Sequence, residues 1–148
     1  MNAQKPREIA VNLLCEHAEG RHYLEVLFEQ NGAKNSLSPS DRGLLQEITF
    51  GAVRWQATLD WLIKRRTGGR VQKTVLQAIL RLGLYQLLWL DRIPAHAAVH
   101  EMVELAKVKG FGPQSGFVNA VLRGYAREIP GTKALLNELK SHIQLQPG

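Results

Sequence analysis

The sequence predicts an all-α fold. Apolar residues recur at helical spacing along most of the 148 residues, and no segment sustains the alternation of β-branched and polar residues typical of strands. Glycine and proline pairs, such as Gly68-Gly69 and Pro130-Gly131, interrupt this spacing where helices are expected to end. The sequence contains no repeat or low-complexity tract, so we expect a single domain.

The N-terminal half is predicted to begin with two helices. The first runs from Pro6 to Glu19, because proline suits a first helical position and apolar residues follow at helical spacing. A short second helix over 23–30 leads into a loop over 31–37. A third helix starts at Ser38-Pro39-Ser40-Asp41, which combines a capping serine, a proline and an acid in the first turn. Its apolar spacing continues to Leu62, so the helix is long unless a break over 54–57 divides it.

The C-terminal half is predicted to contain the centre of the core. Residues 74–90 are apolar almost all round, which is typical of a buried helix. Helices over 94–107 and 114–127 follow, separated by Gly110-Phe111-Gly112-Pro113. Pro130-Gly131 indicates a boundary, so we assign 1–130 to the domain and 131–148, which has a weak helical pattern, to the start of a linker.

The composition favours a polyanionic partner. The net charge is +6, with 45% hydrophobic and 22% charged residues, and an excess of positive charge attracts nucleic acid or acidic surfaces. No apolar run is long enough to span a bilayer, and Met1 to Glu8 lacks the apolar core of a signal peptide. One cysteine excludes an intramolecular disulfide and a multi-cysteine zinc site. We therefore expect a cytoplasmic protein.

The last core helix carries the strongest candidate for a binding face. Ser115, Asn119, Arg123 and Arg127 are four residues apart, which aligns them on one side of a helix. The helix starts near Gln114, where unpaired backbone N–H groups and the helix dipole favour anions. This arrangement suits a phosphodiester backbone. The alternative interpretation is an ordinary solvated helix face.

A second basic patch follows the long helix. Residues 54–73 contain six basic residues and one acid, a net charge of +5. Two cations would complement a helix C-terminus, but five occur within ten residues, which indicates steering of phosphates. These five are Lys64, Arg65, Arg66, Arg70 and Lys73.

Other charged and aromatic residues allow two interpretations. Lys5 and Arg7 lie at a helix start, where the dipole disfavours cations, so we expect a binding role. Arg81, within the buried helix, is expected to pair with an acid such as Glu47 or Glu101. The three tryptophans lie on apolar faces and are expected in the core rather than as base-stacking platforms: Trp55, Trp61 and Trp89.

The sequence shows no active site. His96 and His100 have a spacing compatible with zinc, but Ala97 replaces the glutamate of a metalloprotease and no third ligand is apparent. Cys15 is expected to be a buried or half-buried thiol rather than a nucleophile. No glycine-rich loop follows a strand, so the chain encodes no nucleotide or methyl-donor pocket of Rossmann type. We therefore expect no catalytic residue, metal or cofactor within the chain.

Several short motifs occur together: Asp41-Arg42, Glu47-Ile48, Gly51, Leu59-Asp60-Trp61-Leu62, Leu80-Arg81-Leu82-Gly83, Tyr85-Gln86-Leu87-Leu88 and Phe117-Val118-Asn119. With Ile93-Pro94 and Val103-Glu104-Leu105-Ala106-Lys107, they resemble the NusB family over about Arg7 to Arg127. The run Ile93-Pro94-Ala95-His96-Ala97-Ala98-Val99-His100-Glu101 is most similar to the N-terminal domains of the Sun/Fmu (RsmB) ribosomal RNA cytosine-5 methyltransferases.

The resemblance implies a helical bundle of two packed three-helix units that binds RNA. In the family, basic residues of the first helix and the start of the last core helix bind RNA, which map here to Arg7 and to Gln114–Asn119 with Arg123. The family's methyltransferases also have a C-terminal domain with catalytic cysteines and S-adenosylmethionine as cofactor, neither of which this chain encodes.

We therefore expect an RNA-binding accessory domain that docks ribosomal RNA, weakly and salt-dependently, for a tethered methyltransferase domain. The alternative is a transcription antitermination factor that pairs with a ribosomal protein and a leader RNA. A third interpretation is a scaffold domain that only packs against its own catalytic half.

Overall fold

The protein is built from α-helices joined by short turns. The computed structural model describes residues 5–143, apart from the side chains at 33–34 and 141–143. In chain order the elements are α1 (Lys5–Ala18), α2 (Leu24–Asn35), α3 (Pro39–Arg54), α4 (Gln56–Thr67), α5 (Thr74–Trp89), α6 (Ala95–Val108), the 3₁₀ turn η1 (Gly112–Gln114), α7 (Ser115–Ala126) and α8 (Ile129–Ile143). The described residues include no strand, and the predicted all-α class is confirmed.

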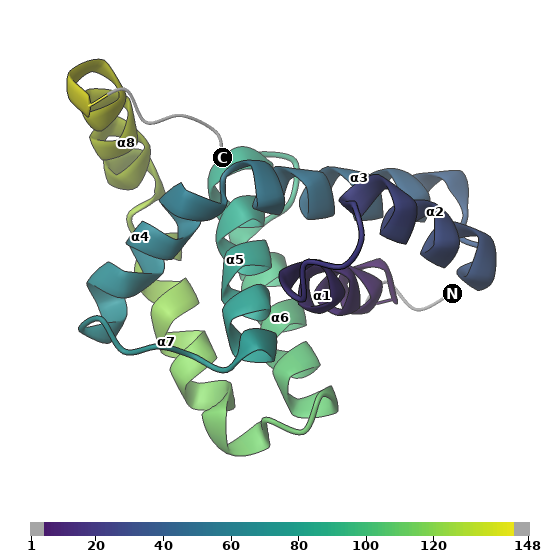
Figure 1. The fold of residues 1–148 in the computed structure, drawn as a ribbon. Coiled ribbons are helices and arrows are strands. Elements are labelled where there is room, and N and C mark those ends of the chain that lie inside the picture. Colours follow the sequence, from purple (N-terminus) through teal and green to yellow (C-terminus); the bar gives the residue numbers. More distant parts are fainter. Residues whose placement is uncertain (1–4, 144–148) are drawn as a thin grey trace.

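Six helices form two three-helix units that pack against each other (Figure 1). In the first unit α1, α2 and α3 contact one another, and in the second α5, α6 and α7 do so. The units meet where α5 lies against α1 and α3. The expected pair of three-helix units is therefore present, with α4 connecting them and α8 packed on α5 and α7.

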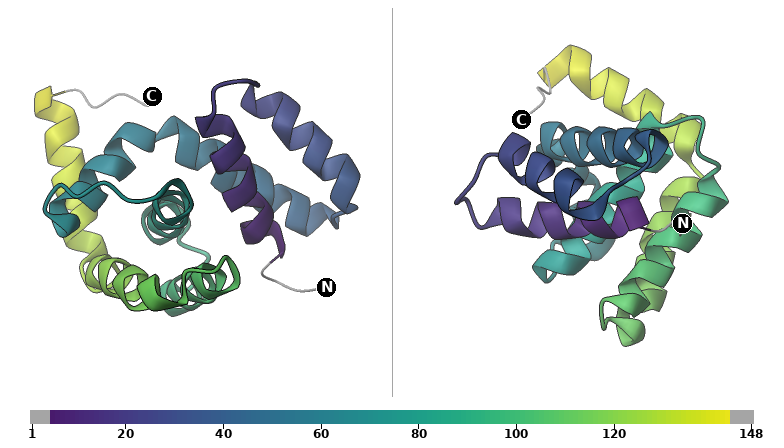
Figure 2. Two further views of the ribbon diagram at one scale, coloured as in Figure 1. Left: turned by 60° about the horizontal axis from the view of Figure 1, so that its bottom comes forward. Right: turned by 90° about the vertical axis from the view of Figure 1, so that its right-hand side faces the viewer.

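α5 is the central helix. It is surrounded by the other helices when viewed nearly along its axis (Figure 2, left), and eleven of its 16 residues are buried. Their side chains pack against both three-helix units, as the apolar pattern over 74–90 predicts. Because burial of each leucine contributes about 1.5–3 kcal/mol, this helix supplies much of the stability that both units share.

The close approach of α3 to α5 depends on a glycine. A Cβ atom at Gly51 would lie 2.1 Å from Cζ of Tyr85, a distance that two carbon atoms cannot adopt. The aromatic ring of Tyr85 thus lies directly on the backbone of α3. On the other side of the molecule, the hydroxyl of Tyr125 donates to the carbonyl oxygen of Leu62 at 2.6 Å and holds α7 against α4.

The structure corrects the predicted end of the second helix and confirms the predicted start of the third. α2 continues to Asn35, so the predicted loop over 31–37 is wrong for most of its length. The amides of Asn31 and Asn35 each donate to the carbonyl four residues earlier, at 2.8 Å, and extend the helix. The predicted long helix is divided at Trp55, within the predicted window 54–57. Its predicted start is confirmed, because Oγ of Ser38 accepts a hydrogen bond from the backbone N–H of Asp41 at 3.1 Å.

The segment expected to begin a linker is largely helical. Pro130 and Gly131 lie in the first turn of α8 and do not interrupt it, because the first turn requires no N–H from proline. Thr132 is buried and Leu136 packs against the core. The domain boundary at 130 and a linker role for 131–148 stay predictions, and residues 144–148 lie outside the described range.

Candidate nucleic-acid interface

The orientation of α7 is fixed by its apolar side. Val118, Leu122 and Tyr125 are fully buried against the neighbouring helices. Residues at 115, 119, 123 and 127 lie on another side of the helix, since positions four apart share a face. At its start, the hydroxyl of Ser115 donates to the carbonyl oxygen of Gly112 at 2.7 Å and so connects α7 to η1.

The polar side of α7 forms an ordered pair. Nε of Arg123 donates to Oδ1 of Asn119 at 3.1 Å, which shows that these residues share a face, as their spacing predicts. Arg123 and Arg127 are exposed, and neither forms an ion pair within the described part of the chain. Gln114 is exposed in η1. The placement of this group is as expected, and its contact with RNA stays a prediction.

Arg7 does not lie on the surface. Only 7% of the residue is exposed, and its Nε donates to Oε1 of Gln86 at 2.8 Å inside the core. Burial lowers the pKa of its guanidinium, and the negative charge of Glu101 partly opposes this shift. We correct the expectation of RNA contact here, because the charge of Arg7 is used between α1 and α5. Lys5, half-buried at the start of α1, stays a candidate.

Arg66 connects the second basic patch to α7. Its Nη2 donates to Oε2 of Glu128 at 2.7 Å, and its guanidinium lies 4.5 Å from the ring centroid of Tyr125. Gly124 leaves room for it, since a Cβ there would lie 2.9 Å from Nη1 of Arg66. The two predicted basic regions therefore adjoin beside Arg123. An exposed ion pair contributes at most about 1 kcal/mol, so Glu128 holds Arg66 only weakly.

The remainder of the second basic patch is exposed and not neutralised. Its four other cations form no ion pair within the part of the chain that the structure describes: Lys64, Arg65, Arg70 and Lys73. Arg65 lies over the ring of Trp61, 5.1 Å from its centroid. Nζ of Lys73 is 6.0 Å from the ring centroid of Phe111, just before η1. The patch is thus adjacent to the start of α7 as well as to its C-terminal half.

Arg81 forms the kind of ion pair that was predicted, with a different partner. Its Nε and Nη2 donate to Oδ1 and Oδ2 of Asp60 at 2.7 and 2.9 Å. Nε2 of Gln77 adds a third hydrogen bond to Oδ1, at 2.8 Å. The prediction of Glu47 or Glu101 was wrong because α4 places Asp60 opposite this side of α5. Two-pronged pairing makes this contact stronger than an ordinary ion pair.

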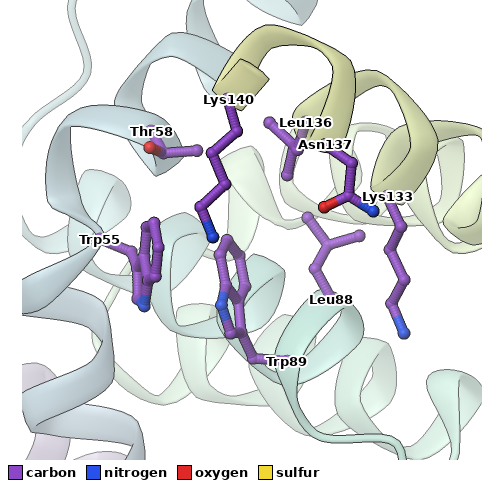
Figure 3. A pocket seen from close by; sticks show the side chains of 8 residues that line it. All are labelled: Trp55, Thr58, Leu88, Trp89, Lys133, Leu136, Asn137 and Lys140. Carbon is purple, nitrogen blue, oxygen red and sulfur yellow. The ribbon is translucent and has the colours of Figure 1, made fainter. Parts of the chain in front are cut away.

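A pocket of about 220 Å³ opens between α8 and the α4–α5 side of the bundle (Figure 3). The indoles of Trp55 and Trp89 line it with ring centroids 5.3 Å apart. Behind them Tyr85 stacks on Trp89, with the centroids 5.4 Å apart and the planes 8° from parallel. Both tryptophans contact the core, as predicted, yet they are only half-buried. Trp61 is 38% exposed, so its prediction as a core residue is wrong.

The histidines considered as metal ligands and the cysteine considered as a nucleophile lie on different helices, α6 and α1. His96 and His100 are both exposed on α6, and the described residues contain no group of three or more potential metal ligands. Burial raises the pKa of the Cys15 thiol, with Lys109 opposing the shift, so the thiol is the favoured form at neutral pH. No helix in the described range combines the length and apolar character required to cross a membrane.

The arrangement of helices and the sequence motifs agree with a known family. A sequence model of the NusB family matches residues 4–127. The chain belongs to the NusB family. Among solved structures, NusB of T. maritima superposes with a TM-score of 0.78 at 24% identity, and the match covers 90% of this chain and 96% of that one. This likeness shows the shared NusB fold.

Curated relatives of this NusB-family chain are named as enzymes. It is 36% identical to the probable ribosomal RNA small subunit methyltransferase B of Bacillus subtilis, over 91% of this chain and 31% of that protein. It is 39% identical to the protein of the same name from Synechocystis, over 90% of this chain and 30% of that protein. The chain therefore spans about a third of the length of these relatives.

Sequence reasoning missed two features of this NusB-family surface. Gly124 had no assigned role, although it leaves the room that Arg66 occupies. The polar residues of α8 at the pocket, Lys133, Asn137 and Lys140, were assigned to a linker. Their spacing at 133, 137 and 140 places them on one helix face, and this was the available signal.

Proposed function

We propose that this NusB-family chain is an RNA-binding accessory domain of a small-subunit ribosomal RNA (cytosine-5) methyltransferase. It docks ribosomal RNA in the cytoplasm for a tethered catalytic domain that uses S-adenosylmethionine. Support comes from relatives named as ribosomal RNA methyltransferases at 36–39% identity. The chain itself contributes binding and no chemistry.

The distribution of unpaired cations supports the location of the interface. Several basic residues elsewhere are neutralised, for example Arg42 by Glu29, Arg92 by Glu47 and Lys107 by Glu104. By contrast, six exposed cations in the two adjoining basic regions have no ion pair within the described residues: Lys64, Arg65, Arg70, Lys73, Arg123 and Arg127. This concentration of free positive charge is the observation on which the proposal depends.

The geometry of α7 suggests how phosphates are held. The side chain of Asn119 accepts from Nε of Arg123, which leaves the two terminal nitrogens free to form a two-pronged contact with a phosphate. Arg127 lies one turn further along the same face. Two such contacts one turn apart would follow one RNA strand, with the second basic patch attracting the strand from beside it.

Salt dependence tests whether docking is electrostatic. We expect fluorescence anisotropy with a labelled single-stranded ribosomal RNA fragment to show that log Kd rises linearly with log salt concentration, with a slope of about 0.7 per phosphate contacted. Binding that is unchanged between low and moderate salt would contradict the proposal.

Charge reversal locates the contact. We expect Arg123→Glu to weaken binding several-fold and to reduce the salt slope by about 0.7–1, because one phosphate contact is lost. Lys107→Glu is the matched control, since Lys107 is exposed and already neutralised by Glu104. Equal losses in both variants would show that only overall charge matters, and would overturn the assignment to α7.

The antitermination alternative keeps one supporting observation. The chain has the fold of the solved NusB of T. maritima, with a TM-score of 0.78. A factor of this type should capture a small ribosomal protein and a leader RNA together. Retention of a purified ribosomal protein by the immobilised chain, with a reading frame that encodes no methyl-donor domain, would favour this alternative.

A further inference from the structure

The pocket beside α8 has an unusual combination of side chains for a gap between helices. Two indoles form its aromatic wall beside Thr58, Leu88 and Leu136, and α8 also supplies two lysines and an asparagine amide, with no acid among the lining residues (Figure 3). An ordinary packing defect in a helical bundle is lined by aliphatic groups. The composition here matches a ligand that is flat, aromatic and anionic.

The aromatic wall is rigid. Trp89 is held from behind by the nearly parallel ring of Tyr85, and Trp55 lies at the junction between α3 and α4, where the backbone bend fixes its direction. Stacked rings that are already ordered lose little conformational entropy when a third ring is added. A nucleobase stacked on such a platform contributes to affinity whatever its identity.

The two lysines differ in their present partners. Nζ of Lys133 is 2.8 Å from Oδ1 of Asp91, so part of its charge is neutralised. Nζ of Lys140 instead lies 5.4 Å from the ring centroid of Trp55 (Figure 3), and forms no ion pair within the described residues. A cation over an indole contributes only about 0.5–1 kcal/mol at an exposed site, so a phosphate can draw this ammonium away and uncover the ring.

We propose that this pocket takes one unstacked base of single-stranded RNA. The base stacks on the indole of Trp55 and lies beside that of Trp89, whose plane is tilted by 36°. Lys140 and Lys133 contact the flanking phosphates, and the amide of Asn137 is available to the base edge. At about 220 Å³ the pocket is smaller than the roughly 300–1,000 Å³ typical of sites for whole ligands, which suits one base rather than a longer segment. The inference rests on the proposed RNA-binding function and adds a second contact, on α8.

Tryptophan fluorescence provides a direct test. The chain contains three tryptophans, and Trp61 lies outside the pocket beside Arg65. In a Trp61→Phe background all indole emission therefore comes from Trp55 and Trp89. We expect a single-stranded RNA hexamer to quench this emission saturably, and the same hexamer with abasic positions to bind through its phosphates without quenching.

Two variants in that background identify the contact. We expect Trp55→Leu to weaken hexamer binding about tenfold, within the range measured for loss of one stacked base, and Lys140→Glu to weaken it several-fold. Lys140 is exposed, so its reversal should leave the fold intact even if Trp55→Leu does not. Lys107→Glu should bind as well as the parent, because Lys107 lies on α6 outside the pocket and is already paired with Glu104.

The outcomes separate this inference from the proposed function. If hexamer and abasic hexamer bind equally, or if Lys140→Glu changes nothing while Arg123→Glu weakens binding, the pocket takes no base and the α7 interface still holds. If neither RNA binds at low salt, the proposed function fails as well. Binding of a peptide from another domain in the pocket, at the expense of RNA, would also overturn the inference.

Discussion

Arg7 and Arg123 carry the same guanidinium in opposite surroundings. Arg7 is enclosed between α1 and α5, with Gln86 as its hydrogen-bond partner, whereas Arg123 is exposed and held by Asn119. A buried charge must be compensated inside the protein, so Arg7 is tied to stability. An exposed arginine that forms no ion pair within the described residues is available to a phosphate, so we assign Arg123 to the proposed binding.

Substitution of these two arginines should therefore separate stability from affinity. We expect Arg7→Ala to lower the free energy of unfolding by about 2–4 kcal/mol, because Gln86 and Glu101 lose a charged partner in the core. RNA affinity of the folded fraction should not change. Urea denaturation followed by circular dichroism, with anisotropy on the same samples, measures both quantities.

Arg123→Ala is the matched opposite case. Its unfolding free energy should stay within about 0.5 kcal/mol of the parent, as for most surface substitutions, while RNA binding weakens. If Arg7→Ala weakened RNA binding at unchanged stability, our correction of its role would be wrong.

At the scale of single elements, contacts between helices limit which residues are tolerated. In α3, Gly51 lies beneath the ring of Tyr85, whereas Gly43 lies in the same helix with nothing within 4 Å of its Cβ position. Both glycines are equally unfavourable for an isolated helix. They differ only in what the next helix places against them.

The two positions form a controlled pair of substitutions. We expect Gly51→Ala to destabilise the protein by about 1–3 kcal/mol, because the added methyl group forces Tyr85 and α5 outward. Gly43→Ala should stabilise it by about 0.5–1 kcal/mol, through helix propensity alone. Thermal unfolding of both variants checks this, and stabilisation by Gly51→Ala would show that α3 and α5 are less closely packed than described.

Local signals explain which elements could be predicted from the sequence. The start of α3 and the end of α4 were predictable, because Ser38 caps through its own side chain and Gly68 has a positive φ of 64° that suits glycine. The end of α2 was not, because asparagine favours turns in general and extends this helix only through two specific amide contacts. α8 was given only a weak helical pattern and assigned to a linker, because Pro130-Gly131 was interpreted as a boundary.

In the candidate site, too, only features set by local spacing could be predicted from the sequence. The shared face of Asn119 and Arg123 follows from helix periodicity and was predicted. The burial of Arg7 depends on Gln86, 79 residues away, and the pairing of Arg81 with Asp60 depends on how α4 lies against α5. The pocket combines side chains from α4, α5 and α8, and no spacing within one segment encodes that meeting.

For the whole molecule, the position of α5 determines how the fold unfolds in denaturant. It packs on α1 and α3 of the first unit and on α6 and α7 of the second, so the two units share one hydrophobic core through it. Two units that share a core should lose their structure together rather than in sequence.

We therefore expect one cooperative unfolding transition. Tryptophan emission, from indoles in and beside α4 and α5, should change at the same urea concentration as the helical signal in far-ultraviolet circular dichroism. A fluorescence midpoint clearly below the circular dichroism midpoint would indicate that the region around α4 and α5 opens first, against the shared-core interpretation.

The bend at Trp55 has a practical consequence for redesign. The residue that ends α3 and redirects the chain into α4 also presents its indole to the pocket. Substitution of Trp55 to change ligand preference would therefore also disturb the bend between α3 and α4. Asn137 and Lys140 are exposed on the outermost helix, so directed evolution of new specificities should start from α8.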